Sequence, residues 1–489
     1  MSSVFAVKKP NVSESGGPIL TCKMTIQADF LKLLKTDCPA AFVDTLPPQH
    51  IPSIVFIDGQ VKLMKAESVK TWPLFVKVQF MSTIERAFAS GAHTVVLGFD
   101  DYRYVPSAKN MTQIKRNKVV PVMEFGAHDT LPYCLPDQWS SAMRNRNFKV
   151  KVVNKVIEDV KVWFLKYVQE YPLWSQRCLV IDFCGKPVVL RSANSLPSKD
   201  LALFVENQAE TFWVGRGECD VKAFTWLVKN QPLLIVSTDG DFVPMSLLQL
   251  QDKPDCEIYI QRLKIHVETS PLGKATGTEA NQGKRSNKRK ASELSTTAVV
   301  FNSNESKRSY EFVLMSKVMS WVQQNMPSKT CAPIMQFSAM IAMCGCDFVM
   351  TLPRVGARTI WKYRQKLQSL NLSTTSDILS AMSIIYYDMY VAKHVTPVFL
   401  QHSAQNSRMQ DISFCREGYT TMFKRLQNNA KVAANIKTAV WSVDRACAHA
   451  KNTQWALQYW TKLQHADDAH ATDYGYSKDA KGRTIFACL

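Results

Sequence analysis

Short apolar runs that end in an acidic residue recur along this sequence, and they constrain its fold more than any other feature. The run IPSIVFIDG ends at Asp58 and Gly59, HTVVLGFDD ends at Asp100, and PLLIVSTDGDF ends at Asp239 and Asp241. Helical patterns separate these runs. Buried strands that alternate with helices are typical of α/β proteins, in which parallel strands direct their carboxyl ends to one edge of the sheet. The sequence therefore predicts a central, mostly parallel sheet flanked by helices, with acidic residues at the edge where such folds bind ligands.

The length of 489 residues implies a main body with either additional layers or a second domain. A single hydrophobic core stops growing at roughly 250 to 300 residues. A polar stretch rich in Gly and Ser interrupts the apolar pattern, and it offers too little apolar surface to fold by itself. The expected division is an N-terminal extension (1–23), a first core part (24–267) with an insertion at about 103–217, a disordered basic linker (268–310), a second core part (311–370) and a helical C-terminal region (371–489).

Composition points to a polyanionic partner and away from a membrane. The formal net charge is +19, and such an excess of Lys and Arg is typical of proteins that bind nucleic acid. No stretch reaches the ~18 consecutive apolar residues that a bilayer span needs, so we expect no membrane partner. The 13 cysteines include no CxxC pair, which argues for free thiols and against a zinc module or a disulfide framework.

Seven acidic residues stand at the end of an apolar run or at the start of a helix. They are Asp58, Asp100, Glu218, Asp220, Asp239, Asp241 and Asp347. A single aspartate at a strand end is more often a helix cap than a ligand. Seven of them converging on one sheet would repel strongly unless cations were bound between them. Carboxylates without His or Cys select hard ions, so the sequence predicts two Mg²⁺ ions, with Mn²⁺ as a substitute.

The order and surroundings of these acids resemble the flap endonuclease superfamily, which includes the XPG-type repair nucleases and more distant 5′ exonucleases. TIQADFLKLLKTDCPAAF is similar to the family's opening Gly-Ile-Gln helix, with Thr25 in place of the glycine. VFIDG and GFDDYRYVPSAKNMTQIKR resemble the first two metal-binding segments. AMCGCDFVMTLPRVGARTIWKY resembles the last metal aspartate followed by a helix-two-turn-helix element. The resemblance implies a PIN-like nuclease core with a helical arch and that element.

The resemblance also implies roles for individual residues. One ion would be held by Asp58, Asp100, Glu218 and Asp220, and the other by Asp239, Asp241 and Asp347. Lys109 and Arg116 would be catalytic, because they would stabilise the charge that develops on the scissile phosphate. Contacts to the nucleic acid would come from Lys115, Arg144, Arg146, Gly356, Arg358 and Lys362. Arg354 departs from the family pattern, because the first of two glycines is usual at its position.

The segment RNRNFKVKVVNKVIEDVKVWFLKYVQ (144–169) predicts a helix with two possible uses. Basic residues alternate there with aromatic ones, among them Phe148, Trp163 and Phe164. This pattern suits the threading or clamping of a single strand, and it suits equally an amphipathic helix that packs its aromatic residues on the core. A turn at 184–187, flanked by RCLVIDF and VVLRS, predicts a β-hairpin after this helix.

The function expected from the sequence is a metal-dependent, structure-selective nuclease that cuts DNA at 5′ flaps, junctions or 5′ ends by a two-metal mechanism. Two alternatives stay open: an RNA endonuclease of the same superfamily, and a catalytically inert scaffold that binds nucleic acid. The basic cluster from Lys284 to Lys290 predicts a nuclear location, with a cytoplasmic location as the alternative. A sliding-clamp peptide is not evident, and the sequence does not indicate an oligomeric state.

Overall fold

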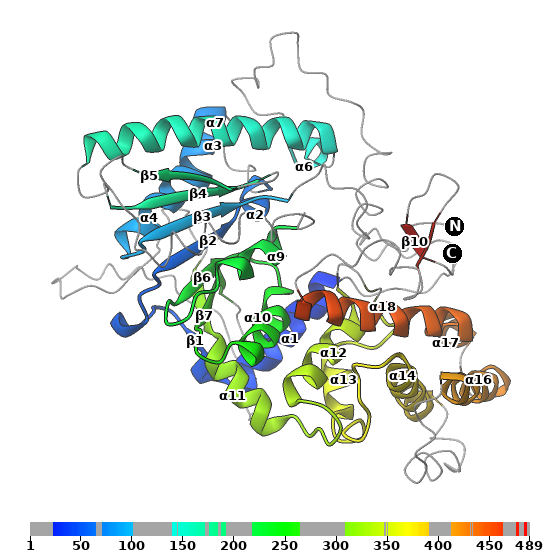
Figure 1. The fold of residues 1–489 in the computed structure, drawn as a ribbon. Helices are drawn as coiled ribbons and strands as arrows, with labels where there is room; N and C mark the ends of the chain where they lie inside the picture. Colours follow the sequence, from blue (N-terminus) through cyan, green and yellow to red (C-terminus); the bar gives the residue numbers. More distant parts are fainter. Residues whose placement is uncertain are drawn as a thin grey trace, which may run out of the picture.

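The computed structural model of the chain shows a central sheet with helices on both faces (Figure 1). It describes residues 23–64, 71–100, 139–143, 145–171, 176–183, 187–191, 218–264, 309–346, 349, 351–390, 412–430, 432, 434–462, 476–478 and 484–486. The predicted linker therefore lies almost wholly outside the described residues, as do the first 22 residues.

Within these residues eight strands form one mixed sheet, in the order β1-β8-β7-β6-β2-β3-β4-β5. Their bounds are β1 (Phe42–Val43), β2 (Ile54–Asp58), β3 (Thr94–Gly98), β4 (Cys178–Asp182), β5 (Val188–Arg191), β6 (Leu233–Val236), β7 (Ile258–Leu263) and β8 (Tyr310–Leu314). The neighbours from β7 through β6, β2 and β3 to β4 run parallel, whereas β1, β8 and β5 pair antiparallel. The mostly parallel sheet predicted from the sequence is confirmed, and so is the hairpin of β4 and β5.

One face of the sheet is covered by short helices and by one long helix, α7, which crosses it in Figure 1. These elements are α2 (Gly59–Leu63), α3 (Trp72–Val76), the π-helical turn η3 (Lys77–Met81), α4 (Ser82–Ala89), α6 (Trp139–Ala142) and α7 (Arg146–Glu170). Alternation along the strands directs Val55 and Ile57 of β2 to this face, where they join a buried cluster with Val156 and Phe164 of α7. The helix predicted at 144–169 is confirmed.

The opposite face carries α1, α9 and the helices that follow the sheet in sequence. They are α1 (Lys23–Asp37), α9 (Cys219–Ala223), α10 (Phe242–Asp252), α11 (Met315–Asn325), α12 (Pro333–Cys344), α13 (Ala357–Tyr363), α14 (Thr375–Tyr390), α16 (Ile412–Asn428), α17 (Ala434–Ala439) and α18 (Val443–Lys462). Ile54 and Phe56 of β2 belong to the buried cluster on this side, which extends without a break to Trp460 of α18. The predicted C-terminal helices therefore share one core with the sheet.

Three short turns and a small second sheet complete the described elements. The turns are the 3₁₀ helices η1 (Pro39–Ala41), η2 (Pro48–His50) and η5 (Phe224–Trp226). Strands β9 (Tyr476–Lys478) and β10 (Thr484–Phe486) pair antiparallel near the end of the chain. Among the helices of the described ranges, none combines the length and the apolar character that crossing a membrane requires.

Strand β8 was not predicted individually, because the sequence indicates a mostly helical chain from about residue 311. The run YEFVL at 310–314 pairs antiparallel with β7 through partners such as Arg262 and Glu311. Aromatic and β-branched residues favour a strand, but the run is only five residues long. Its strand partner precedes it by almost fifty positions, which no local pattern can reveal.

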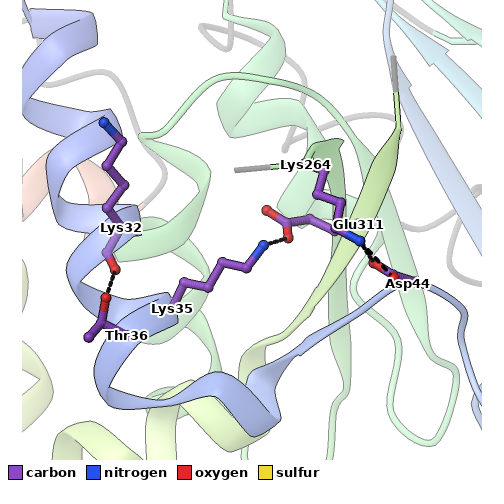
Figure 2. Close-up of polar contacts among 6 residues, drawn as sticks. All are labelled: Lys32, Lys35, Thr36, Asp44, Lys264 and Glu311. Carbon is purple, nitrogen blue, oxygen red and sulfur yellow. Dashed lines mark hydrogen bonds and ion pairs between the residues drawn. The ribbon is translucent and has the colours of Figure 1, made fainter. Parts of the chain in front are cut away.

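Figure 2 shows two ion pairs near β8 and β7, Lys35 with Glu311 and Lys264 with Asp44. Lys35 of α1 reaches the carboxylate of Glu311 on β8, and Glu311 is almost completely buried. Lys264, just after β7, holds both carboxylate oxygens of Asp44 at 2.7 Å. The second pair is more exposed, and exposed pairs stabilise by only about 0 to 1 kcal/mol because water screens them. The Lys35 pair joins α1 to β8, whereas the Lys264 pair joins the ends of β7 and β1.

Candidate functional site

The central parallel strands bring the strand-end acids to one edge of the sheet. Asp58 is the last residue of β2 and lies beside Gly98, the last residue of β3, with Asp100 two positions further on. Ile57 of β2 pairs with Val236, the last residue of β6. The loop that carries Asp239 and Asp241 therefore leaves the sheet at the same edge. These four acids therefore lie at the same edge of the sheet, Asp58 at a strand end and Asp239 and Asp241 in a loop.

Asp58 occupies the centre of this edge. Its Oδ1 accepts a hydrogen bond from the backbone N–H of Val61 at 3.1 Å and thereby caps α2, and its Oδ2 accepts one from Ser237 Oγ at 2.7 Å. Burial raises the pKa of Asp58 to about 6, the hydrogen bonds from Ser237 and Val61 oppose this, and the negative charges of Asp100 and Asp239 raise it further. The carboxyl group thus lies in a site that disfavours additional negative charge.

Helix α9 docks directly onto Asp100 and Asp58. The backbone N–H of Cys219 donates to Asp100 Oδ1 at 2.9 Å, and Cys219 Sγ lies 3.6 Å from Asp58 Oδ1. Gly98 permits this approach, because an added Cβ there would meet the Phe56 ring at 2.3 Å and Cys219 Sγ at 3.1 Å. Glu218, the N-cap residue of α9, and Asp220, in its first turn, are both buried at this edge.

The loop between β6 and α10 is held by hydrogen bonds within the loop, from Asp241 to Asp239, and to Gln27 of α1. Asp239 accepts a hydrogen bond from the backbone N–H of Asp241 at 3.0 Å. The Gln27 side chain of α1 donates to the Asp241 carboxylate. A Cβ at Gly240 would meet Gln27 Cβ at 2.8 Å, so the glycine is what lets α1 lie this close. Helix α1 thus reaches the site through Gln27.

Buried cations flank the acidic edge on both sides. On the β4 side, Lys222 Nζ lies 3.2 Å from Asp182 Oδ1, and these side chains are 3% and 0% exposed. On the β7 side, Arg262 is buried beside Glu311, and burial lowers the pKa of Arg262 to about 10, while Glu311 and Asp239 oppose this shift. Glu311 in turn is paired with Lys35, as seen in Figure 2.

Along this edge, in the order of the strands, acidic and basic side chains alternate, except at Asp100, Asp58 and Asp239, where acids follow one another. The order of strands gives Asp182 with Lys222, then Asp100 and Asp58, then Asp239, Arg262 and Glu311, and finally Lys35. Among the described residues, the ion pairs therefore reach the flanking acids Asp182 and Glu311 but not Asp58 and Asp100 at the centre of the edge.

The donor chemistry at this centre fits a hard divalent cation, although the acids are not gathered around a single point. The groups at this edge are carboxylates, which Mg²⁺ and Mn²⁺ prefer. The pKa of Asp58 is raised mainly by burial, and the charges of Asp100 and Asp239 add to this. In the part of the chain that the structure describes, no three His, Cys, Asp or Glu side chains lie close enough together to enclose an ion. Asp347, the seventh predicted ligand, lies outside the described residues.

Several other predicted residues lie outside the described residues. Lys109, Lys115 and Arg116 fall in the undescribed segment 101–138, and Arg144 is likewise undescribed. Arg146 is the first residue of α7, and nothing is established about its side chain. The proposed catalytic role of Lys109 and Arg116 and the proposed contacts of Lys115, Arg144 and Arg146 stay predictions.

The aromatic residues of α7 distinguish between its two predicted uses. Phe148 and Phe164 are buried at 2% and 0% exposure in the cluster between α7 and the sheet. Trp163 packs against the edge of the same cluster. Lys155, on the same helix, pairs with Asp159 at 3.0 Å. Packing on the core therefore accounts for these aromatic residues, and the interpretation of α7 as a surface that stacks bases of a threaded strand is wrong for Phe148 and Phe164.

Basic residues line the exposed side of α13 and the turn before it. Arg354, Arg358 and Lys362 are exposed and follow one another at intervals of four. Arg354 has φ 58, a left-handed conformation that glycine adopts without cost and other residues adopt rarely. Gly356 precedes α13 in an extended conformation, and an added Cβ there would meet nothing within 4 Å. The start of α13 is therefore open.

Sequence reasoning missed five residues of this edge: Gln27, Asp182, Lys222, Ser237 and Arg262. Asp182 carried the same signal as the predicted acids, because it ends the apolar run RCLVIDF, but the run was interpreted only as part of a hairpin. Lys222 stands four positions after Glu218, in the segment where only the acids Glu218 and Asp220 were predicted to have a role. Ser237 and Arg262 carry no local signal, because their partners Asp58 and Glu311 are distant in sequence. Gln27 lies in the segment compared with a Gly-Ile-Gln helix, but its contact with Asp241 was not predicted.

No protein-family model matches the chain, and no curated protein matches it either. The function has to be argued from the edge itself. It combines converging carboxylates, flanking buried cations and a separate basic surface on α13, which together suit the binding of a divalent cation beside a polyanion.

Proposed function

We propose that this protein is a metal-dependent nuclease that hydrolyses phosphodiester bonds in DNA at 5′ flaps, junctions or 5′ ends. The observation that carries the proposal is that, within the described ranges, no ion pair reaches the acids at the centre of the acidic edge. Asp58 and Asp100 lie between the buried pair of Lys222 with Asp182 on one side and the buried Arg262 beside Glu311 on the other. A divalent cation would complete the alternation at this point and would favour the ionised form of Asp58, whose pKa is raised mainly by burial and further by the charges of Asp100 and Asp239.

The proposed ligands follow the arrangement of the strands. Asp58, Asp100, Glu218 and Asp220 would hold one Mg²⁺, and Asp239 and Asp241, with Asp347, the other; Mn²⁺ would substitute. When bound, such a pair of ions supplies a nucleophilic water and stabilises the leaving oxygen of a phosphodiester. Ser237 would orient Asp58 through its 2.7 Å hydrogen bond. Gln27 would orient Asp241 in the same way, so that both acids enter the reaction in fixed rotamers.

Nucleic acid as the substrate is supported by the charge outside the acidic edge. The formal net charge of +19 favours association with a polyphosphate backbone. Arg354, Arg358 and Lys362 form an exposed basic stripe, and α13 together with α12 and the segment between them would form the helix-two-turn-helix element that holds a duplex. The sheet order and these elements support a PIN-like assignment. DNA is chosen over RNA because of the resemblance to the flap endonucleases, and the RNA endonuclease is the outcome that the substrate test below separates.

A scaffold that binds nucleic acid without cutting it is the second candidate, and two observations favour it. Asp58, Asp100, Asp239 and Asp241 each already accept a hydrogen bond from the protein. Metal ligation would have to compete with these donors. In addition, no group of three potential ligands is gathered around one point within the described ranges. Either function is compatible with a nuclear location, which stays a prediction because the cluster from Lys284 to Lys290 lies outside the described residues.

The decisive experiment compares three labelled substrates with Mg²⁺ or EDTA: a 5′-flap DNA, a duplex with a 5′ overhang and a single-stranded RNA. We expect cleavage of the DNA substrates with Mg²⁺ alone. Asp239→Asn should abolish cleavage but retain DNA binding, because it removes a proposed ligand and not the basic stripe. Asp255→Asn is the matched control, since Asp255 is an exposed acid paired with Lys229 near the start of β7. Cleavage of RNA alone would favour the RNA endonuclease, and no cleavage of any substrate would favour the scaffold.

A further inference from the structure

A buried ion pair beside the acidic edge involves two residues that the proposed reaction does not use directly. Lys222 Nζ lies 3.2 Å from Asp182 Oδ1 and donates a hydrogen bond to the backbone carbonyl of Phe99 at 2.9 Å. The carbonyl oxygen of Asp182 lies 3.5 Å from the same nitrogen. Lys222 thus connects α9 to the carboxyl ends of two strands, β3 and β4.

The contacts of Lys222 fix the part of the chain that carries two of the proposed ligands. Helix α9 is only five residues long, too short to be stable without tertiary contacts. Its start is held by the hydrogen bond from Cys219 N–H to Asp100. Lys222, three residues later, supplies a second and separate attachment. Two attachments at different strands restrict both the position and the rotation of α9, and therefore the placement of Glu218 and Asp220.

An ion pair at this depth is not required for stability. Replacing a buried pair by apolar side chains of similar volume is often neutral or stabilising, because the desolvation of two charges offsets their attraction. Apolar contacts are not directional, so they hold a helix against a sheet without fixing its rotation about its own axis. The pair at Lys222 and Asp182 is therefore better explained by placement of α9 than by its contribution to folding.

We propose that Lys222, held by Asp182, is a positioning residue that sets the divalent-cation affinity of the acidic edge by fixing Glu218 and Asp220 on α9. This inference rests on the proposed function, because it assumes that the edge binds such cations. Groups that orient metal ligands typically change metal affinity by 10- to 100-fold when they are removed. An effect of about that size is expected here.

The test measures Mn²⁺ binding in the absence of any substrate, by the electron paramagnetic resonance signal of free Mn²⁺. The main variant is Lys222→Met/Asp182→Leu, which removes both charges together and so leaves no unpaired charge in the core. Lys222→Arg keeps the cation. Lys229→Met/Asp255→Leu is the control, because it removes a lysine and aspartate pair of 2.8 Å from the opposite end of the strands.

We expect the main variant to retain its thermal midpoint and to bind Mn²⁺ about 10- to 100-fold more weakly. Lys222→Arg should stay within a few-fold of the unaltered chain, and the control pair should leave the affinity unchanged. Unaltered affinity in the main variant, or an equal loss in the control, would overturn the inference. If the main variant does not fold, Asp182→Asn replaces it. It should likewise bind Mn²⁺ about 10- to 100-fold more weakly, and unaltered affinity would overturn the inference.

The failure of the inference and the failure of the proposed function give different results. A chain that binds Mn²⁺ with the same affinity with and without the pair would refute the positioning role and leave the proposed metal site intact. An unaltered chain that binds no Mn²⁺ at millimolar concentration would refute both.

Discussion

Replacing Asp58 by Asn should stabilise the metal-free protein at neutral pH. Burial, together with the charges of Asp100 and Asp239, raises the pKa of Asp58 from 3.8 to about 6 in the folded state. Ionisation is therefore less favourable in the folded chain than in the unfolded one. The associated stability is fully present below about pH 4 and is lost as the pH rises through about 6.

The magnitude follows from the pKa change. At about 1.4 kcal/mol for each pH unit, the penalty above pH 7 is about 3 kcal/mol. In the wild-type chain the two carboxylate oxygens accept from Val61 N–H and from Ser237 Oγ. Asn carries no charge. Its Oδ1 can still accept from Val61 N–H, and its Nδ2 can donate to Ser237 Oγ. Asp58→Asn should thus raise the free energy of unfolding by up to about 3 kcal/mol at pH 8, and by much less at pH 4.

Urea denaturation at pH 4 and pH 8 in EDTA measures this difference directly. Asp255→Asn serves as the control, since that exposed acid should change stability by no more than about 1 kcal/mol at either pH. Added Mg²⁺ should stabilise the unaltered chain more than the Asp58→Asn variant. An Asn variant that is less stable at pH 8, or that shows the same difference at both pH values, would refute the electrostatic reasoning.

Three further predictions follow from the packing and from the basic stripe. Gly98→Ala should destabilise the protein by about 1 to 3 kcal/mol in urea denaturation, because the new methyl group overlaps the Phe56 ring; an unchanged midpoint would contradict that contact. Arg354→Gly should change stability by less than about 1 kcal/mol, whereas Arg354→Val should cost about 1 to 3 kcal/mol, because the backbone there has positive φ; equal effects would argue against that conformation. Arg358→Ala and Lys362→Ala should each weaken DNA binding and lower the salt dependence by about one counterion in fluorescence titrations; an unchanged slope would remove these residues from the interface.

The sequence was sufficient for features that depend on local pattern. The alternation of buried strands with helices predicted the parallel sheet, and an acid at the end of each run predicted that Asp58 and Asp100 would lie at the same edge of it. Both inferences depend only on neighbouring residues and on the geometry of parallel strands. The segment of α7 shows the limit of this approach, because basic and aromatic residues in one helix suit packing and nucleic-acid binding equally. Burial of Phe164 in the structure distinguishes them.

The residues that the sequence did not reveal owe their role to contacts between distant segments. Gln27 matters because α1 packs on the loop at Gly240, more than 200 residues later. Lys222 faces Asp182 only because β4 lies next to β3 in the sheet. No spacing in the sequence encodes either pairing, so both require the assembled fold.

The central claim is that a divalent cation fills the gap in the alternating charges between Asp58, Asp100 and Asp239. Anomalous diffraction from crystals of the protein grown or soaked with Mn²⁺ tests it most directly. The account predicts an anomalous peak at about 2.0 to 2.2 Å from carboxylate oxygens at this edge, and its loss in crystals of the Asp100→Asn variant. A well-ordered edge without a peak, or a peak that persists unchanged in the variant, would contradict the account.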